Sequence, residues 1–208
     1  MTKMTGGQAI VRTLMRHGVD TVFGLPGVQL DNTFDALYEA KDKVRVVHTR
    51  HEQGAAYMAL GYAQATGKVG TCIVVPGPGV LNTGAALSTA YGSNVPVLCL
   101  TGQIPSYQIG LGLGIPHEIR DQHQAMAGVV KWVGRAETPG EAPQKLREAF
   151  RAMLGGRNQP AVFEMAPDVM GRSEDVELLE PERFNEGPQT DEKTIVAAAT
   201  LLGQAEKP

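Results

Sequence analysis

The chain has 208 residues, a length that suits one ordinary domain with some residues left for a linker or the start of a second domain. Hydrophobic residues make up 42% and charged residues 20%, as in an average globular protein, which excludes disorder for most of the chain. The formal net charge of -3, without basic runs, gives no reason to expect a nucleic-acid or membrane partner.

Helical and strand patterns alternate through residues 1–170. A first helix is predicted over residues 5–17, because Thr5 and Gln8 fit a capping box and Gly18 can end the last turn. Short apolar runs rich in Val and Ile then predict six strands, at residues 21–23, 44–48, 71–75, 97–100, 129–133 and 161–165. Further helices are predicted at residues 30–40, 52–66, 80–91 and 141–154.

The strand runs are apolar throughout and do not alternate, which is typical of strands covered on both faces. We therefore predict an α/β fold with a doubly wound, mostly parallel six-stranded sheet and helices on both faces. Cys72 and Cys99 lie inside two of these runs, so we expect both to be buried, reduced thiols. His48 is expected on a buried strand.

The composition changes after the last predicted strand. Residues 171–190 are acidic, contain two prolines and show no sustained period, so we interpret them as an exposed linker after a domain at residues 1–170. A new helical pattern begins at Thr194, and the chain stops where a further strand would follow, so we expect a chain that has been cut. No apolar run approaches the roughly 20 residues that span a bilayer, and the start lacks a signal-peptide core, so we expect a cytoplasmic protein.

A glycine-rich turn, Pro76-Gly77-Pro78-Gly79-Val80-Leu81-Asn82, joins a predicted strand to the next helix. Such turns present backbone N–H groups and a helix N-terminus to a ligand. The turn is not a dinucleotide-binding fingerprint, because Asn82 occupies the third glycine position, and it is not a P-loop, because no Gly-Lys pair follows. Many turns of this kind only connect two elements tightly, so the turn alone leaves both interpretations open.

Glu52 lies where a predicted strand gives way to the helix at residues 52–66. The segment is not the zinc motif H-E-x-x-H, because Ala55 stands where the second histidine would be. A glutamate in the first turn of a helix is ordinarily a solvated charge that complements the helix dipole. By itself, therefore, Glu52 does not indicate a site.

A third polar segment runs from Thr101-Gly102-Gln103 through a glycine-rich stretch to His117 and Glu118. It follows the strand at residues 97–100, at the edge where open α/β sheets bind ligands. Its histidine and carboxylate would suit acid–base chemistry, and they would equally suit ordinary solvated positions.

The order of these motifs resembles the N-terminal domain of acetolactate synthase and its relatives, a family of thiamine-diphosphate-dependent decarboxylases, lyases and carboligases that act on 2-oxo acids. The resemblance extends from about residue 4 to the end of the chain. Four segments carry it, namely Val22-Phe23-Gly24-Leu25-Pro26-Gly27, the stretch from Arg50 to Ala63, the turn from Pro76 to Asn82, and Pro96-Val97-Leu98-Cys99-Leu100-Thr101-Gly102-Gln103. It implies the thiamine-diphosphate-binding fold, with residues 1–170 as the pyrimidine-binding domain and residues 191–208 as the start of a truncated middle domain.

The resemblance also implies roles for individual residues. In this family the glutamate that matches Glu52 hydrogen-bonds a ring nitrogen of the cofactor's aminopyrimidine and so assists removal of the proton from the thiazolium carbon. A carboxylate buried against an aromatic heterocycle has a raised proton affinity, which suits it to share a proton with the ring. Glu52 is therefore the expected catalytic residue. The other residues expected around the cofactor are Pro26, Gly27, Gly77, Pro78, Asn82 and Gln103.

The chain departs from the family pattern in two places. His117 and Glu118 stand where acetolactate synthases usually carry a Phe-Gln pair facing the reacting carbonyl groups, so we expect this pair to contact substrate. No Gly-Asp dipeptide, which opens the family's Mg²⁺-diphosphate motif, occurs in the chain. We therefore expect Mg²⁺ and the diphosphate to be held outside this segment, by a C-terminal domain of the same or another subunit, and no metal ligands within it.

We interpret the chain as the cofactor-activating domain of a thiamine-diphosphate enzyme that decarboxylates or ligates small 2-oxo acids. Such an enzyme is expected to be a homo-oligomer, and this chain alone is expected to be inactive. Two alternatives stay open. The chain could be a natural subunit of a split 2-oxo-acid decarboxylase, or a non-catalytic module that binds a nucleotide-like ligand.

Overall fold

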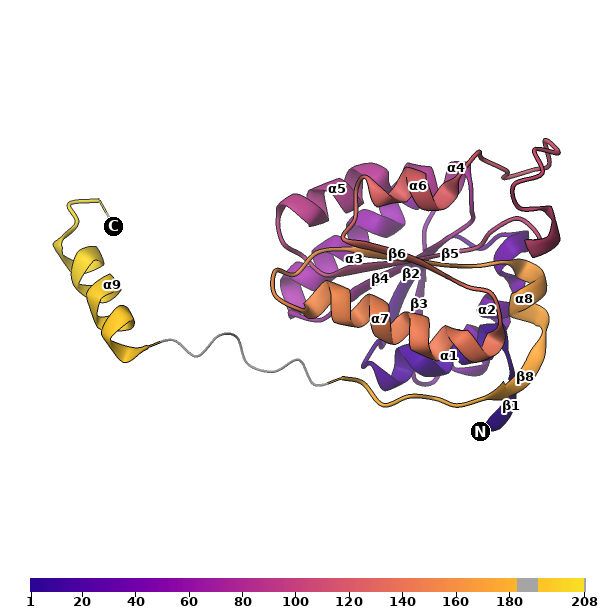
Figure 1. Cartoon of the computed structure of the whole chain (residues 1–208), viewed down its shortest axis with the longest axis horizontal. Helices are drawn as coiled ribbons and strands as arrows, with labels where there is room; N and C mark the ends of the chain where they lie inside the picture. Colours follow the sequence, from indigo (N-terminus) through magenta and orange to yellow (C-terminus); the bar gives the residue numbers. More distant parts are fainter. Residues whose placement is uncertain (183–190, 208) are drawn as a thin grey trace.

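The structure, a computed structural model, describes residues 1–182 and 191–207 of the chain. A six-stranded sheet forms its middle layer (Figure 1), and all neighbouring strands in it are parallel. In spatial order the strands are β3 (Arg45–His48), β2 (Thr21–Gly24), β4 (Gly70–Val74), β5 (Val97–Thr101), β7 (Ala161–Met165) and β6 (Trp132–Ala136). The predicted α/β fold with a parallel six-stranded sheet is confirmed.

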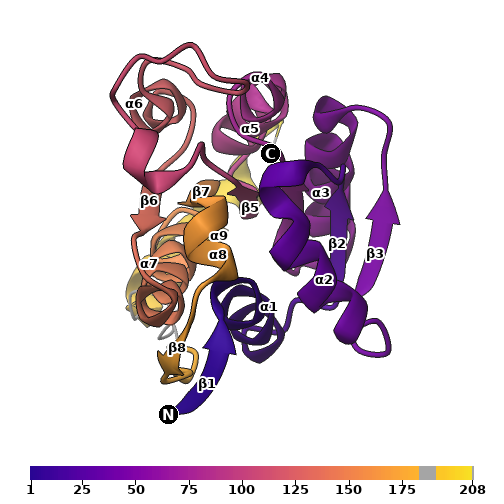
Figure 2. The same cartoon turned by 90° about the vertical axis from the view of Figure 1, so that its right-hand side faces the viewer.

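Helices cover both faces of this sheet. One hydrophobic cluster includes residues of α1 (Gly6–Arg16), α2 (Asp31–Glu39), α7 (Ala142–Leu154) and α8 (Pro167–Gly171). The opposite cluster includes residues of α3 (Glu52–Thr66), α4 (Pro78–Asn82), α5 (Gly84–Gly92) and α6 (Gln122–Ala127). Figure 2 shows α1 and α7 on one side of the strands and α5 and α6 on the other.

Successive side chains along a strand point to opposite faces of the sheet and therefore belong to different clusters. Ile73 of β4 belongs to the first cluster, whereas its neighbours Cys72 and Val74 belong to the second. A strand with apolar residues at every position therefore suits the middle of this sheet, since both of its faces are covered. Cys72 and Cys99 are free and buried, as the sequence predicts.

Local signals set the ends of two long helices. At α1 the Thr5 hydroxyl accepts from the Gln8 N–H at 3.1 Å, and the Gln8 side chain accepts from the Thr5 N–H at 3.1 Å, so the predicted capping box is confirmed. The helix α3 runs over the predicted residues 52–66. It ends at Gly67, whose φ of 71° is a left-handed conformation that glycine adopts without strain.

Two predicted elements differ from the structure. The strand predicted at residues 129–133 is β6 at Trp132–Ala136, because the Val129 N–H instead bonds the Met126 carbonyl at the end of α6. The helix predicted at residues 80–91 is divided into α4 and α5 at Thr83, whose hydroxyl bonds the Val80 carbonyl at 2.6 Å. Short 3-10 helices lie at Val28–Leu30, Ser106–Gln108 and Pro139–Glu141.

The prediction that His48 lies on a buried strand is wrong. β3 is an edge strand that pairs with β2 alone, and His48 is exposed. A run of apolar residues does not distinguish an edge strand from a central one, because the distinction depends on which strands lie beside it.

A second, two-stranded antiparallel sheet joins the two ends of the domain. It pairs β1 (Thr2–Thr5) with β8 (Ser173–Val176) and buries Met4 and Val176. The sequence analysis assigned residues 173–176 to the linker, and that assignment is wrong for these four residues. The two strands lie at opposite ends of the domain, so no pattern in the nearby sequence indicates that they pair. Residues 183–190 of the predicted linker lie outside the described residues.

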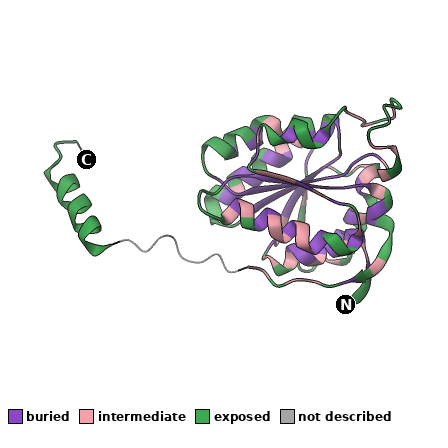
Figure 3. Cartoon of the chain, in the orientation of Figure 1, coloured by how far each residue is buried: buried purple, intermediate pink, exposed green. Residues whose placement is uncertain are grey.

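The helical pattern predicted from Thr194 corresponds to α9 (Glu192–Gln204). All of its residues are exposed (Figure 3). Across the described residues, none of the helices combines the length and the apolar character that a membrane crossing requires.

Candidate active site

A mostly apolar cavity of about 680 Å³ lies among the loops that follow β2, β4 and β5. Because the carboxyl ends of parallel strands meet at one edge of the sheet, loops far apart in the sequence converge there. The lining residues are Leu25, Pro26, Gly27, Val28, Gln29, Glu52, Val75, Pro105, Gln108, Ile115, Pro116 and His117. Three of the predicted site residues, Pro26, Gly27 and Glu52, therefore share one cavity with the predicted substrate residue His117.

Glu52 is held in place by the start of α3. The Thr49 N–H bonds the Gly24 carbonyl at 2.9 Å, which keeps the chain extended just beyond β3. His51 then caps the helix, since its Nδ1 accepts from the Gln53 N–H at 3.1 Å. Glu52 is thus the first helical residue, with a half-buried side chain that reaches the cavity.

The Glu52 carboxylate is paired with Asn82, which lies 30 residues away in the sequence. The Asn82 amide Nδ2 donates to Oε2 of Glu52 at 2.9 Å. Asn82 is the last residue of α4 and Glu52 the first of α3, so the contact joins the two helices that leave the sheet edge at this point. The predicted catalytic residue and one predicted cofactor-binding residue are therefore in direct contact.

Glycines in the turn after β4 are required by close contacts. Gly77 has a φ of 58°, and a Cβ there would lie 2.3 Å from the His117 carbonyl oxygen. A Cβ at Gly79 would lie 2.5 Å from Val75 Cγ2 and 3.5 Å from Oε1 of Glu52. A Cβ at Gly27 would lie 2.3 Å from Val75 Cγ1. The missing side chains allow Val75 and the His117 backbone to pack directly against these glycines.

Four predicted cofactor residues, Gly77, Pro78, Asn82 and Gln103, are not among the residues that line the cavity. Pro78 is exposed in the first turn of α4. Gln103 is buried, and its Oε1 accepts from the Ile104 N–H at 2.8 Å, so this side chain stabilises the loop that follows β5. The structure thus groups Gly77, Pro78 and Asn82 in one turn next to Glu52, while Gln103 is buried and is not among the lining residues.

His117 and Glu118 do not act as a pair in the structure. His117 lines the cavity, with its Nδ1 at 3.1 Å from the Pro76 carbonyl oxygen and a φ of 70°. Glu118 instead accepts from the N–H groups of Gly114 and Ile115, at 2.6 and 3.2 Å. The carboxylate of Glu118 therefore closes its own glycine-rich loop, and its side chain is not part of the cavity lining.

The loop that carries Pro105 and Gln108 is fixed to α8. Asp168 accepts from the Ser106 N–H at 2.8 Å and from the Ser106 hydroxyl at 2.6 Å. Burial raises the pKa of Asp168, but the hydrogen bonds from Ser106 outweigh burial and hold the pKa below its ordinary value. The carboxylate therefore stays charged and keeps this wall of the cavity in position.

The sequence analysis missed several residues that build the site. Val75 forms the apolar floor between Gly27 and Gly79, and Gln29 and Gln108 add polar groups to the wall. Gln122 lies behind the turn and accepts from the Gly77 N–H at 2.8 Å. The only local signal for Gln122 is Asp121, a helix cap that accepts from the Gln124 N–H. Nothing in the sequence shows that Gln122 is buried.

The described residues provide a carboxylate for an organic ligand and no evident cation site. The lining contains one acidic residue, Glu52, and no lysine or arginine. Among residues 1–182 and 191–207, no cluster of three or more His, Cys, Asp or Glu could hold a metal ion. The cavity is thus suited to a flat, largely apolar group with one polar edge, and poorly suited to a multiply charged anion.

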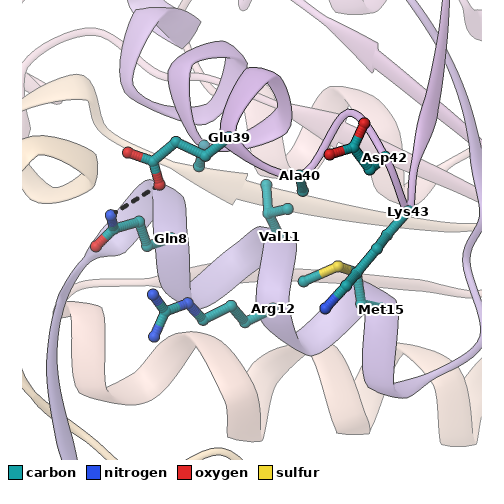
Figure 4. Close-up of a pocket in the computed structure, with 9 residues that line it drawn as sticks. Gln8, Val11, Arg12, Met15, Glu39, Ala40, Asp42 and Lys43 are labelled. Atoms are coloured by element: carbon teal, nitrogen blue, oxygen red, sulfur yellow. Dashed lines mark hydrogen bonds between the residues drawn. The ribbon is translucent and has the colours of Figure 1, made fainter.

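A second groove, of about 290 Å³, lies between α1 and α2 (Figure 4). It is lined by side chains of both charges, among them Arg12, Glu39 and Lys43. Gln8 donates to Glu39 across it at 3.1 Å. None of the predicted site residues lies there, so we assign the site to the cavity at the sheet edge.

Comparison with known proteins gives one family and a consistent set of relatives. The model of the "Thiamine pyrophosphate enzyme, N-terminal TPP binding domain" matches residues 4–127. The chain is 36% identical over 207 residues to a probable 2-ketoarginine decarboxylase of Pseudomonas aeruginosa, covering 99% of this chain and 36% of that protein. It is 37% identical over 213 residues to an acetolactate synthase of Arthrospira platensis, covering 99% and 36%.

The acetolactate synthase large subunit of Corynebacterium glutamicum is 35% identical over 211 residues, which cover 99% of this chain and 33% of that protein. The chain therefore spans about a third of the length of the curated relatives it matches.

Proposed function

The chain belongs to the thiamine pyrophosphate enzymes, whose N-terminal domain it carries, and on that premise we propose that it supplies the cofactor-activating domain of an enzyme that decarboxylates or ligates small 2-oxo acids. One observation carries the proposal. A half-buried carboxylate, Glu52, lies in the wall of an apolar cavity and is held there by Asn82 at 2.9 Å.

The residues around Glu52 fit the aminopyrimidine end of thiamine diphosphate. The Val75 side chain packs directly against Gly27 and Gly79 and lines the cavity, where it gives an apolar surface for a ring. Asn82 binds Oε2 of Glu52, while Oε1 lies on the side of Gly79, where a Cβ would come within 3.5 Å. A ring lying on Val75 would thus meet a carboxylate oxygen at its edge.

In this proposal the chain's own groups orient and hold a proton. The cofactor, when bound, supplies a thiazolium carbon that serves as an electron sink for 2-oxo acids. Glu52 shares a proton with a ring nitrogen of the pyrimidine, and Asn82 keeps the carboxylate in the orientation that this requires. The side chains of Pro26 and Val75 give the cavity apolar walls, and a ring packed against them would displace water and so strengthen its hydrogen bond to Glu52.

The remaining parts of such a site are proposed to come from outside the chain. No lysine or arginine lines the cavity, so the Mg²⁺ and the diphosphate are assigned to a C-terminal domain of the same or another subunit of a homo-oligomer. We propose residues 1–170, extended by β8 through Val176, as the pyrimidine-binding domain and residues 191–208 as the start of a middle domain, with a linker between them that begins after β8.

For the substrate, we propose a small 2-oxo acid that contacts His117. Its imidazole lies in the same cavity as Glu52. Glu118 is assigned a different role, that of shaping the loop whose N–H groups it binds. The printed names of the relatives, acetolactate synthase and 2-ketoarginine decarboxylase, support a 2-oxo acid without selecting one.

The test is the variant Glu52→Gln in the complete enzyme. We expect exchange of the thiazolium proton of bound thiamine diphosphate to slow by roughly 10²- to 10⁴-fold, the usual scale for a general acid–base group. Cofactor affinity should change far less, since the diphosphate anchor is proposed to lie elsewhere. The proton is allowed to exchange in D₂O, the reaction is quenched rapidly, and NMR measures how much has exchanged.

The control for this test is Glu39→Gln, which changes an exposed carboxylate on α2. It should leave the exchange rate as in the wild type. Wild-type proton exchange in Glu52→Gln would refute the proposal and favour the alternative of a non-catalytic binding module.

A further inference from the structure

A buried glutamine on α6 connects the loops that form the site. Gln122 is 2% exposed. Its Oε1 accepts from the Gly77 N–H at 2.8 Å, and its Nε2 donates to the Gly102 carbonyl at 3.0 Å. One side chain therefore joins the turn after β4 to the turn after β5, which are otherwise separate stretches of backbone.

A buried carboxylate fixes which way this amide points. Nε2 of Gln122 also donates to Oε2 of Glu164 at 2.6 Å, and Glu164 is fully buried. The backbone N–H of Gly77 can only donate, whereas the carboxylate and the Gly102 carbonyl can only accept. The amide thus fits in one orientation, with Oε1 toward Gly77.

Arg135 completes the network behind the site. Its Nε donates to Oε1 of Glu164 at 2.6 Å, and Nη2 lies 2.6 Å from the same oxygen. The pair neutralises the buried carboxylate, so Glu164 can serve as a fixed acceptor for Gln122. Residues from β6, β7 and α6 thereby converge on the turn after β4.

The position of the Gly77 peptide affects the orientation of the Glu52 carboxylate. Gly77 has a left-handed φ and is packed against the His117 carbonyl oxygen, so its backbone has little freedom to shift toward that side. The α4 turn that follows presents Gly79 beside Glu52 and Asn82 in hydrogen-bond contact with it. A change in the peptide at Gly77 would therefore move Gly79 and Asn82 relative to Glu52.

We infer that Gln122 is a positioning residue of the cofactor-activating site. By holding the Gly77 peptide against Gly102 and the Glu164–Arg135 pair, it sets the orientation in which Asn82 presents the Glu52 carboxylate. The inference rests on the proposed function for the role of Glu52, but the connection from Gln122 to the turn is a property of this chain.

The test replaces Gln122 by Met, which has a similar length and offers the Gly77 N–H at most a weak thioether acceptor in place of the amide oxygen. Glu164 keeps its Arg135 partner in this variant, so the fold should survive. Amide hydrogen exchange at Gly77 in the 208-residue chain should accelerate about 10-fold, because a buried N–H loses its acceptor. In the complete enzyme, exchange of the thiazolium proton should slow about 10-fold, while the cofactor Kd changes less than about threefold.

Gln122→Asn is the second variant. It keeps the amide, but the shorter side chain cannot reach both loops. We therefore expect a smaller acceleration of amide exchange at Gly77 and a smaller slowing of thiazolium proton exchange. If Gln122→Met fails to fold, this variant carries the comparison. Gln159→Met is the matched control, since Gln159 is also buried but lies before β7 and contacts the Tyr91 carbonyl. It should alter neither readout.

The outcomes separate the inference from the proposed function. If both Gln122 variants free the Gly77 amide but leave proton exchange unchanged, while Glu52→Gln slows it, Gln122 only stabilises the fold and the inference is wrong. Unchanged protection of the Gly77 amide also overturns it. If Glu52→Gln itself has no effect, the proposed function fails, whatever the Gln122 variants do to the amide.

Discussion

At the scale of residues, the site depends on positions that carry no side chain as much as on the side chains that line it. Gly79 lies inside the helix α4, where alanine would normally be preferred by roughly 0.5–1 kcal/mol. In this structure an added Cβ would meet Val75 at 2.5 Å and would lie beside Oε1 of Glu52. The glycine is therefore better explained by the close packing of Val75 against it than by backbone freedom.

We predict that Gly79→Ala destabilises the domain by about 1 kcal/mol, because Val75 has to move aside in a packed floor. Gly84→Ala is the matched control, since Gly84 begins α5 with nothing within 4 Å of an added Cβ. That variant should be neutral or slightly stabilising. Urea unfolding of both measures the difference, and equal stability would mean that the floor adapts freely.

At the scale of elements, the two helices α1 and α7 meet through an aromatic contact. His17, the C-cap of α1, stacks on Phe150 of α7 with ring centroids 4.2 Å apart. Its Nδ1 lies 2.9 Å from the Thr13 carbonyl oxygen, and its Nε2 is buried without a hydrogen-bond partner among the described residues. The imidazole therefore serves as an apolar ring in this contact.

Burial lowers the pKa of His17, and the Thr13 carbonyl opposes that effect only in part. Arg147 also lowers the pKa, while Glu180 and Glu182 raise it. The net pKa of the folded state lies below the ordinary 6.5, so the unfolded chain binds a proton more readily. The stability contributed by this contact is present above pH 6.5 and is lost as the pH falls below it.

We predict that His17→Phe makes the free energy of unfolding less dependent on pH in the acid range. The wild-type chain should lose more unfolding free energy than the variant between pH 7.5 and pH 5, because only the wild type can take up the proton at this position. Urea unfolding at several pH values gives both curves. Parallel curves would show that His17 is protonated equally in both states.

At the scale of the whole molecule, the described residues leave apolar side chains exposed on the segments that form the site, namely α3, α4 and the loops after β2 and β5. Val28, Tyr107, Met58 and Leu81 are 78%, 71%, 43% and 46% exposed. Exposed apolar side chains in such number mark an interaction surface. We propose that the C-terminal domain of the same or another subunit covers them.

The chain alone should therefore bind thiamine diphosphate and Mg²⁺ poorly, show no turnover, and self-associate as a symmetric dimer. Its cavity has no lysine or arginine for the diphosphate, and its described residues hold no metal cluster. Calorimetry measures the binding, and sedimentation measures the association. Micromolar binding by the 208 residues would mean that a diphosphate site exists within them.

Much of the fold could be predicted because its signals are local. Apolar runs located five of the six strands, with β6 three residues later than predicted, the capping box located α1, and the helix over residues 52–66 was predicted with its observed ends. The pairing of β1 with β8 could not be predicted, because its partners come from opposite ends of the domain and neither strand carries a pattern of its own. The edge position of β3 was hidden for a similar reason.

The sequence by itself determined the family, the parallel sheet and the identity of Glu52 as the residue to test, because ordered motifs and apolar runs are properties of the chain. Only the tertiary structure decided which residues meet. In it, Asn82 donates to Glu52, the Glu118 carboxylate accepts from an N–H group of its own loop, and the buried Gln122 accepts from the Gly77 N–H. Such contacts depend on how strands bring distant loops to one edge, which no local pattern encodes.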